Sequence, residues 1–185
     1  MDDNKIIALF FERSEQAIEA LSEKYGVLCS QIAWNILNDR QDAEECVNDA
    51  YLGAWNAIPP QKPNPLRAYI CRIVRNLAIA RYHANTAQKR NSHYDTALEE
   101  LAYCLESPDT IESALHAKEL SHLLDRFLDG LEPKHRVMFV RRYWYAESVE
   151  DIGKRFHMRP NSVSVTLLRI REKLRKFLVK EGYLL

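Results

Sequence analysis

The chain has 185 residues, of which 46% are hydrophobic, and its 26 basic residues balance its 26 acidic ones. This composition is ordinary for soluble globular proteins and excludes a chain that is disordered throughout, while the length allows one or two compact domains. The chain holds only 5 glycines, and long stretches with helical spacing of apolar residues predict an all-helical protein.

The neutral total conceals four blocks of alternating charge. Residues 1–65 carry 5 bases and 11 acids, and residues 66–91 carry 6 bases and no acid. Residues 92–130 carry 2 bases and 9 acids, and residues 131–185 carry 13 bases and 6 acids. Segregation on this scale indicates separate surfaces with separate partners. Two basic blocks divided by an acidic stretch suit a protein that contacts nucleic acid at two places.

Helical spacing of apolar residues begins near Ile6 and continues to Ile36, which predicts two helices joined near Tyr25 and Gly26. The first apolar run, residues 6–11, is too short to span a membrane and follows two acidic residues rather than a basic segment. We therefore expect a cytoplasmic protein without membrane insertion.

A further helix is predicted over residues 42–55, with Cys46, Val47, Ala50, Tyr51 and Ala54 facing inward. Its outer surface is acidic and polar, with Asp42, Glu44, Glu45, Asn48 and Asp49. A solvated helix face is the usual explanation of such a charge run, and a docking surface is the alternative.

A proline-rich loop over residues 58–65 precedes a strong helix from Leu66 to about Asn85. The predicted apolar face of this helix holds Leu66, Tyr69, Ile70, Ile73, Leu77 and Ala80, and four arginines lie elsewhere on it, namely Arg67, Arg72, Arg75 and Arg81. Helical spacing is then lost over residues 86–110, where we place a linker, and it returns in a helix from Glu112 to Leu131.

The last third of the chain predicts a helix-turn-helix. Residues 149–156 form a short amphipathic helix in which Gly153 lets a second helix approach closely, residues 157–159 form the turn, and Pro160 suits the first turn of the next helix. That helix buries Val163, Leu167, Ile170 and Leu174. In this motif the opposite side enters the major groove of DNA, so its residues are candidate base readers, namely Ser162, Val165, Thr166 and Arg169. A pair of short amphipathic helices of another kind is the alternative.

No motif indicates an enzyme, a metal site or a cofactor. Cys29, Cys46, Cys71 and Cys104 lie far apart without a Cys-x-x-Cys pair, so we interpret them as buried, reduced thiols rather than zinc ligands or a disulfide framework. The six histidines are scattered, and the chain has neither a glycine-rich phosphate loop nor a nucleophile elbow. We expect no catalytic residues, no metal and no cofactor.

Residues 38–55 and 66–79 together resemble region two of the extracytoplasmic-function sigma factors of bacterial RNA polymerase. Residues 131–139, with the helix-turn-helix after them, are similar to region four of the same family. The order of the segments and the intervening linker also fit. The resemblance implies an all-α fold of two small helical domains. These are a region-two-like domain over residues 1–88, a linker over 89–111 and a region-four-like domain over 112–185.

The resemblance also implies partners and contact residues. The acidic helix would dock on core RNA polymerase through Asp42, Glu45, Asn48 and Asp49. The following helix would bind and melt the minus-ten promoter element, through Arg67, Tyr69, Arg72, Arg75, Asn76, Arg81 and Tyr82. Arginines can neutralise phosphates, and unpaired bases stack on aromatic rings for roughly 1–3 kcal/mol each. Tyr69 could equally belong to the core, and Asn76 could cap a neighbour instead of contacting a base.

The helix-turn-helix would read the minus-thirty-five element. Besides the candidate base readers, its phosphate anchors would be Arg155, Arg159, Arg169, Arg171 and Lys173. The family usually has Trp at the position of Tyr69, basic residues where Ser164 and Thr166 stand, and Ser or Thr where Arg159 stands, so promoter specificity is expected to differ. Such families are commonly held inactive by an anti-sigma protein.

The predicted function is that of a sigma factor, which binds core polymerase and directs promoter-specific initiation. The alternative is a helix-turn-helix regulator that binds duplex DNA without polymerase. The acidic helix and the arginine-rich helix after it discriminate between the two, because such a regulator has no need of either.

Overall fold

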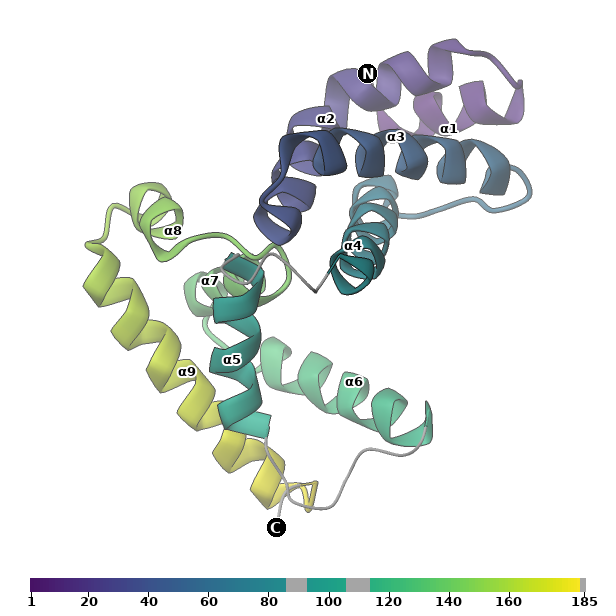
Figure 1. Cartoon of the computed structure of the whole chain (residues 1–185). Coiled ribbons are helices and arrows are strands. Elements are labelled where there is room, and N and C mark those ends of the chain that lie inside the picture. The colour runs from purple at the N-terminus through teal and green to yellow at the C-terminus, as the bar shows by residue number, and fades with distance from the viewer. Residues whose placement is uncertain (86–92, 106–113, 184–185) are drawn as a thin grey trace. The chain divides into compact units, whose positions relative to one another are not determined.

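The computed structural model describes residues 1–85, 93–105 and 114–183, and every regular element in those ranges is a helix. The chain divides into two compact units, residues 1–94 and 95–185 (Figure 1). The prediction of an all-α protein is confirmed. None of the helices in the described ranges is long and apolar enough to cross a membrane.

In the described part of unit 1, four helices lie wholly within the unit. They are α1 (Asp3–Phe11), α2 (Gln16–Leu37), α3 (Arg40–Ala57) and α4 (Leu66–Ala84). Helices α2, α3 and α4 pack against one another, and α1 packs on α2. Their apolar stripes meet in a core whose largest fully buried side chains are Phe10, Ile6, Leu21, Ile32, Ile36, Ile58, Leu66 and Ile70.

The predicted break near Gly26 is wrong, because α2 runs without interruption from Gln16 to Leu37. The chain turns earlier instead, after Phe11, where Arg13 adopts a positive φ of 54°. Gly26 has a packing role, since a Cβ there would lie 3.3 Å from the hydroxyl of Tyr51. A glycine that admits a neighbouring side chain was therefore mistaken for a glycine that ends a helix.

Three thiols lie in the core of unit 1, one on each of α2, α3 and α4, namely Cys29, Cys46 and Cys71. They are buried and free, as predicted. Burial raises the pKa of Cys29 to about 12 and that of Cys46 to about 11, which keeps both thiols protonated and unreactive at neutral pH. The side chain of Cys104 lies outside the described residues.

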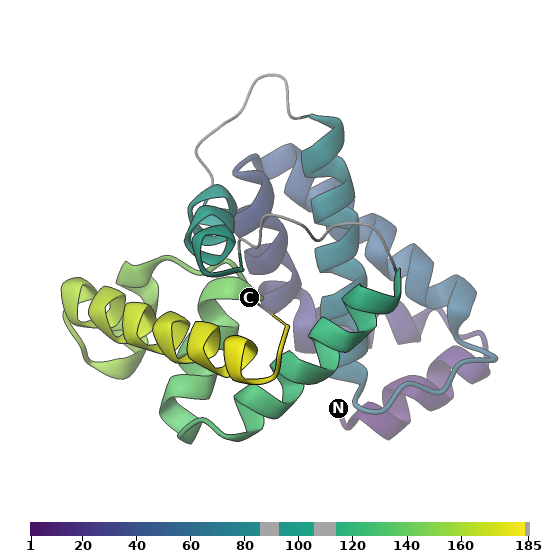
Figure 2. The same ribbon diagram turned by 90° about the horizontal axis from the view of Figure 1, so that it is seen from below.

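Unit 2 contains the remaining helices of the described ranges, except that the first two residues of α5 fall in unit 1. These helices are α5 (His93–Leu105), α6 (Ala114–Asp129), α7 (Pro133–Tyr143), α8 (Val149–Phe156) and α9 (Pro160–Lys180). Helix α9 packs against α6, α7 and α8, and Figure 2 shows it beside them. The core includes Phe127, Met138, Ile152, Leu167 and Leu174. Val163 and Ile170 are buried as well, so the predicted inward face of α9 is confirmed.

Helix α5 lies within the range predicted to lack helical spacing. Ala97 of α5 is buried in the core of unit 2, and Leu101 packs against that core. The helix is short and its surroundings are acidic, so the two apolar contacts did not stand out as a pattern in the sequence. This helix belongs to the unit that carries the helix-turn-helix.

Candidate functional site

The outer face of α3 is polar, acidic and exposed. The helix begins cleanly because the side chain of Asp39 accepts a hydrogen bond from the backbone N–H of Asp42 at 3.0 Å. Its inner face is buried in the core of unit 1. Glu45, Asn48 and Asp49 are exposed, and Asp42 is half-buried. All four predicted docking residues therefore lie on α3, and three of them point to solvent.

An exposed leucine stands on this acidic face and was missed by sequence reasoning. The side chain of Leu52 is 58% exposed, three residues after Asp49 and therefore on the same side of the helix. Leu52 and Asn48 line a shallow hollow of about 250 Å³ together with Ile18, Tyr51 and Trp55. The face thus combines negative charge with an apolar hollow. A protein partner can bind such a face and fill the hollow. The available signal was an apolar residue that breaks the polar outer pattern of α3.

Arg81 of α4 connects the acidic face to the basic helix. Its Nη1 lies 2.8 Å from Oε2 of Glu45 and 3.6 Å from Oδ1 of Asp42. Asn85 also donates a hydrogen bond to Asp42, at 3.0 Å. The hydrogen bond from Arg81 lowers the pKa of Glu45. Arg81, a predicted DNA contact, is therefore paired with Glu45 and Asp42, two of the predicted polymerase contacts.

The exposed side of α4 gathers Tyr69, Arg72 and Asn76, which are spaced by three and four residues and so share one face. Tyr69 is half-buried, and the guanidinium of Arg72 lies 5.8 Å from the centre of its ring. Arg67 is exposed at the start of the helix. Ala80 was expected on the apolar face but is exposed. An aromatic ring, a cation and an amide thus lie together on the solvent side of α4.

Two other predicted minus-ten residues lie in a different environment. Tyr82 packs edge-on against Tyr94, with ring centroids 5.2 Å apart. Arg75 is half-buried, and burial lowers the pKa of its guanidinium although the nearby Tyr94 acts in the opposite direction. These two side chains belong to a group around Tyr94 rather than to the face that holds Tyr69.

The helix-turn-helix is formed by α8 and α9 as predicted. Ser148 caps α8 by accepting a hydrogen bond from the N–H of Asp151 at 3.0 Å. His157 ends that helix with a positive φ of 53°, and Pro160 occupies the first turn of α9. A Cβ on Gly153 would lie 2.7 Å from the carbonyl oxygen of Met158. Gly153 therefore admits the turn backbone, whereas the prediction had it admit the second helix.

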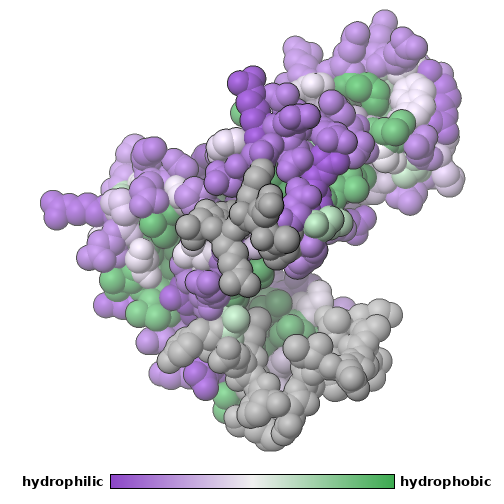
Figure 3. Space-filling view, viewed as in Figure 1, coloured by the Kyte–Doolittle hydropathy of each residue, from purple (hydrophilic) through white to green (hydrophobic). Residues whose placement is uncertain are grey.

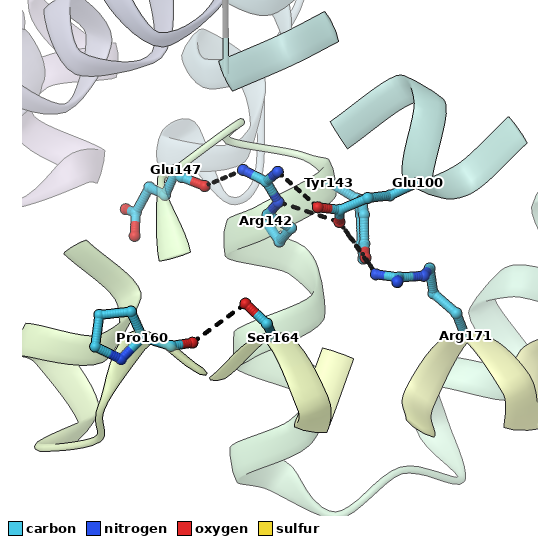
Figure 4. Close-up of polar contacts among 7 residues, drawn as sticks. All are labelled: Glu100, Arg142, Tyr143, Glu147, Pro160, Ser164 and Arg171. Carbon is cyan, nitrogen blue, oxygen red and sulfur yellow. Dashed lines mark hydrogen bonds and ion pairs between the residues drawn. The ribbon is translucent and has the colours of Figure 1, made fainter. Parts of the chain in front are cut away.

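The predicted base readers lie along the first turns of α9. Ser162, Val165 and Arg169 are exposed, and Val165 is 40% exposed. Thr166 is half-buried, and its hydroxyl donates to the carbonyl of Ser162 at 2.8 Å. Ser164 donates to Pro160 in the same way at 3.2 Å (Figure 4). Both hydroxyls use their proton within the helix, which leaves them as acceptors toward a ligand.

Of the predicted phosphate anchors in unit 2, Arg155, Arg159, Arg169 and Lys173 are exposed. Arg171 is not, because its guanidinium turns inward and bonds to Glu100 and to the hydroxyl of Tyr143 (Figure 4). The face of the molecule drawn in Figure 3 is mostly hydrophilic, with small separate apolar areas. Among the described residues, no group of three His, Cys, Asp or Glu side chains could hold a metal ion.

Comparison with known proteins finds two family models that match the chain. The model for Sigma-70 region 2 matches residues 21–88, and the model for Sigma-70, region 4 matches residues 121–174. Together they cover more than half of the chain, with one match in each unit. The chain is similar to the solved structure of CnrH in complex with the cytosolic domain of CnrY. The identity is 20% and the TM-score 0.45, over 96% of this chain and 97% of that one. No curated protein matches the chain.

Proposed function

We propose how this chain, which belongs to the sigma-70 family of RNA polymerase sigma factors, divides promoter recognition between its two units. As a member of the extracytoplasmic-function type, it binds core polymerase and recognises the minus-ten and minus-thirty-five elements of promoter DNA. The observation that supports the division of labour is that one family model matches within each unit. Residues 1–88 then serve docking and melting, and residues 112–185 serve duplex reading.

Docking uses the outer face of α3. Glu45, Asn48 and Asp49 would meet a basic surface of the polymerase, and an apolar side chain of the polymerase would fill the hollow that Leu52 lines. The exposure of these four side chains and the hollow beside them support this assignment. Asp42 is more buried and acts through Arg81 rather than by direct contact.

The minus-ten element is bound by the exposed side of α4. Tyr69 offers a ring for one unpaired base, Arg72 a charge for phosphate and Asn76 donors and acceptors for a base edge. Unstacking one base costs on the order of a few kcal/mol, so a stacking contact worth roughly 1–3 kcal/mol is needed to hold it out of the duplex. Arg67 adds a phosphate contact. Arg75 and Tyr82 remain proposed contacts of the strand, although they lie around Tyr94 and not on the face that holds Tyr69. Arg81 reaches DNA only if its acidic partners are engaged elsewhere.

The minus-thirty-five element is read by α9. Ser162, Val165, Thr166 and Arg169 would face the base edges, as the first turns of a recognition helix do. Arg155, Arg159 and Lys173 would anchor the phosphates. Arg171 is left out of this set because its charge is already paired inside unit 2.

Three further assignments rest on family membership. We expect an anti-sigma protein that covers the DNA-binding surfaces in the inactive state. We also expect the chain to act in the cytoplasm, where core polymerase is found. The chemistry of transcription belongs to the polymerase, so the chain itself contributes binding and not catalysis.

The first experiment adds the purified chain to sigma-free core polymerase on a library of genomic fragments and maps run-off transcripts. Discrete new start sites are expected, and they reveal the promoter elements directly. Specific binding of the free chain to duplex DNA, without association with core, would favour the regulator instead.

A charge reversal then locates the docking surface. Asp49→Lys should abolish association with core polymerase in a pull-down, whereas Glu23→Lys, an exposed acid on α2, should not. Both variants should keep the helical circular dichroism of the parent. Equal association of the two variants would refute docking through α3.

A further inference from the structure

One carboxylate in unit 2 holds three side chains that come from two other helices. Glu100 of α5 accepts hydrogen bonds from Arg142 at 2.8 and 3.3 Å, from the hydroxyl of Tyr143 at 2.9 Å and from Arg171 at 3.1 Å. Arg142 and Tyr143 belong to α7, and Arg171 belongs to α9. Figure 4 shows the three side chains converging on this carboxylate.

Burial makes this cluster sensitive to the loss of any member. Arg142 is 3% exposed, and its guanidinium forms a two-pronged contact with the Glu100 carboxylate. A buried guanidinium is tolerated only when it is paired and hydrogen-bonded, and the fork geometry of arginine matches a carboxylate. Glu100 is therefore the partner that allows a charge to lie at this depth.

The cluster also reaches both helices of the helix-turn-helix. The remaining nitrogen of Arg142, Nη1, donates to the backbone carbonyl of Glu147 at 2.9 Å. Glu147 directly precedes Ser148, the residue that caps α8. On the other side, Arg171 lies in the middle of α9 and also donates to the hydroxyl of Tyr143 at 2.6 Å. The same carboxylate thus constrains the start of α8 and the rotation of α9 about its own axis.

Apolar contacts on the same face of α5 hold the carboxylate in place. Ala97 is 3% exposed and Leu101 packs on the core of unit 2, at positions three residues before and one after Glu100. Ala97 shares one side of the helix with both, since it lies three residues from Glu100 and four from Leu101. Helix α5 consequently presents a packed apolar surface with an acid in its centre to α7 and α9.

We propose that Glu100 is a positioning residue for minus-thirty-five recognition, which fixes the recognition helix α9 relative to α8 through Arg171 and Arg142. This inference rests on the proposed role of α9 in reading DNA. Ser162, Val165 and Arg169 lie on successive turns of α9. They can contact base edges at the same time only if α9 keeps one orientation about its own axis. Loss of the carboxylate would leave the motif folded but loosely oriented.

The test uses the full chain with core polymerase and a promoter found by run-off transcription. Each variant is assayed on the intact promoter, on one with a scrambled minus-thirty-five element, and on a template melted in advance across minus-ten. The first two templates together measure minus-thirty-five discrimination. The third needs no melting and measures initiation that depends on the docking of unit 1 to core polymerase. Glu100→Gln keeps the shape of the side chain but removes its charge. Glu99→Gln, at an exposed neighbouring position, is the matched control.

Glu100→Gln should lower the discrimination ratio about tenfold, as expected for the loss of a charge-assisted hydrogen bond, and leave the pre-melted template within about twofold of wild type. Glu99→Gln should change neither. Arg171→Gln keeps the buried pair of Glu100 and Arg142. It therefore tests the same proposal if Glu100→Gln fails to fold. It should lower the same ratio, and Glu100→Asp should restore part of what Glu100→Gln loses.

An unchanged ratio in a folded Glu100→Gln chain, or in Arg171→Gln if the first variant does not fold, would overturn the positioning role. An equal loss on all templates would also overturn it, because it would indicate a general structural defect. If the wild-type chain starts transcripts without any dependence on the minus-thirty-five element, the proposed reading of DNA by α9 is refuted instead. The two failures are therefore distinct.

Discussion

Replacement of Gly153 by alanine should destabilise unit 2, although alanine is the better helix former. A Cβ at this position would lie 2.7 Å from the carbonyl oxygen of Met158, a backbone atom that cannot rotate away. The same turn is closed by a hydrogen bond from the N–H of Met158 to the carbonyl of Gly153 at 2.9 Å. Relief of the overlap therefore requires the turn between α8 and α9 to move.

The magnitude follows from two opposing terms. Overpacking in a well-packed site costs typically about 1–3 kcal/mol, and glycine to alanine in a helix interior gains roughly 1 kcal/mol. The difference between these terms is about 0–2 kcal/mol. A contact of 2.7 Å to a backbone atom places the expected loss in the upper half of that range, at about 1–2 kcal/mol. For a unit of this size it should lower the melting temperature by roughly 4–16 °C. Minus-thirty-five-dependent transcription should fall in parallel, since the turn sets the position of α9.

Differential scanning calorimetry of the full chain measures this effect, with Gly53→Ala as the matched control. Gly53 lies in the interior of α3, and a Cβ there would meet only a methyl group of Ile73 at 3.7 Å, an ordinary contact. That variant should therefore gain up to about 1 kcal/mol in unit 1. If Gly153→Ala proves as stable as wild type, the close approach of the turn is not what requires glycine.

Further outcomes can be checked on the same protein. Burial acts to raise the pKa of Glu100, but the hydrogen bonds and charges around its carboxylate outweigh burial and lower that pKa. The ionised carboxylate should therefore stabilise unit 2 fully above about pH 4.5, the ordinary pKa of the group, and this stabilisation should be lost as the pH falls through the lowered pKa of the folded state. Glu100→Gln should remove that part of the acid transition in a denaturation series. Burial raises the pKa of Cys29 to about 12 and of Cys46 to about 11, so mass-spectrometric mapping of iodoacetamide adducts should find both unmodified in the native chain up to about pH 9 and modified after unfolding. Arg169→Ala should spare association with core polymerase but weaken promoter use, and a loss of core binding would contradict the assignment of that residue to DNA. Combining it with Asp49→Lys should show no further loss in transcription, since a chain that does not dock cannot use its promoter contacts.

Local sequence patterns are sufficient to predict the helical class, the acidic face of α3, the helix-turn-helix and the buried cysteines. These features depend on short-range spacing: apolar residues every three or four positions create a stripe that must be buried, and Pro160 after a short polar turn starts a new helix. The resemblance to sigma factors rests on the same local segments, so it requires no knowledge of which distant residues meet.

The packing of distant segments, by contrast, sets which charges are available to a partner. Arg81 and Arg171 look like other arginines in the sequence, yet one pairs with Glu45 and the other with Glu100, 36 and 71 positions away. The role of Gly26 in admitting Tyr51 and the packing of α5 onto the core of unit 2 depend on similarly distant contacts. A local pattern records which side of a helix is apolar, but it carries no record of the partner that a charge or a small residue meets when distant segments pack together.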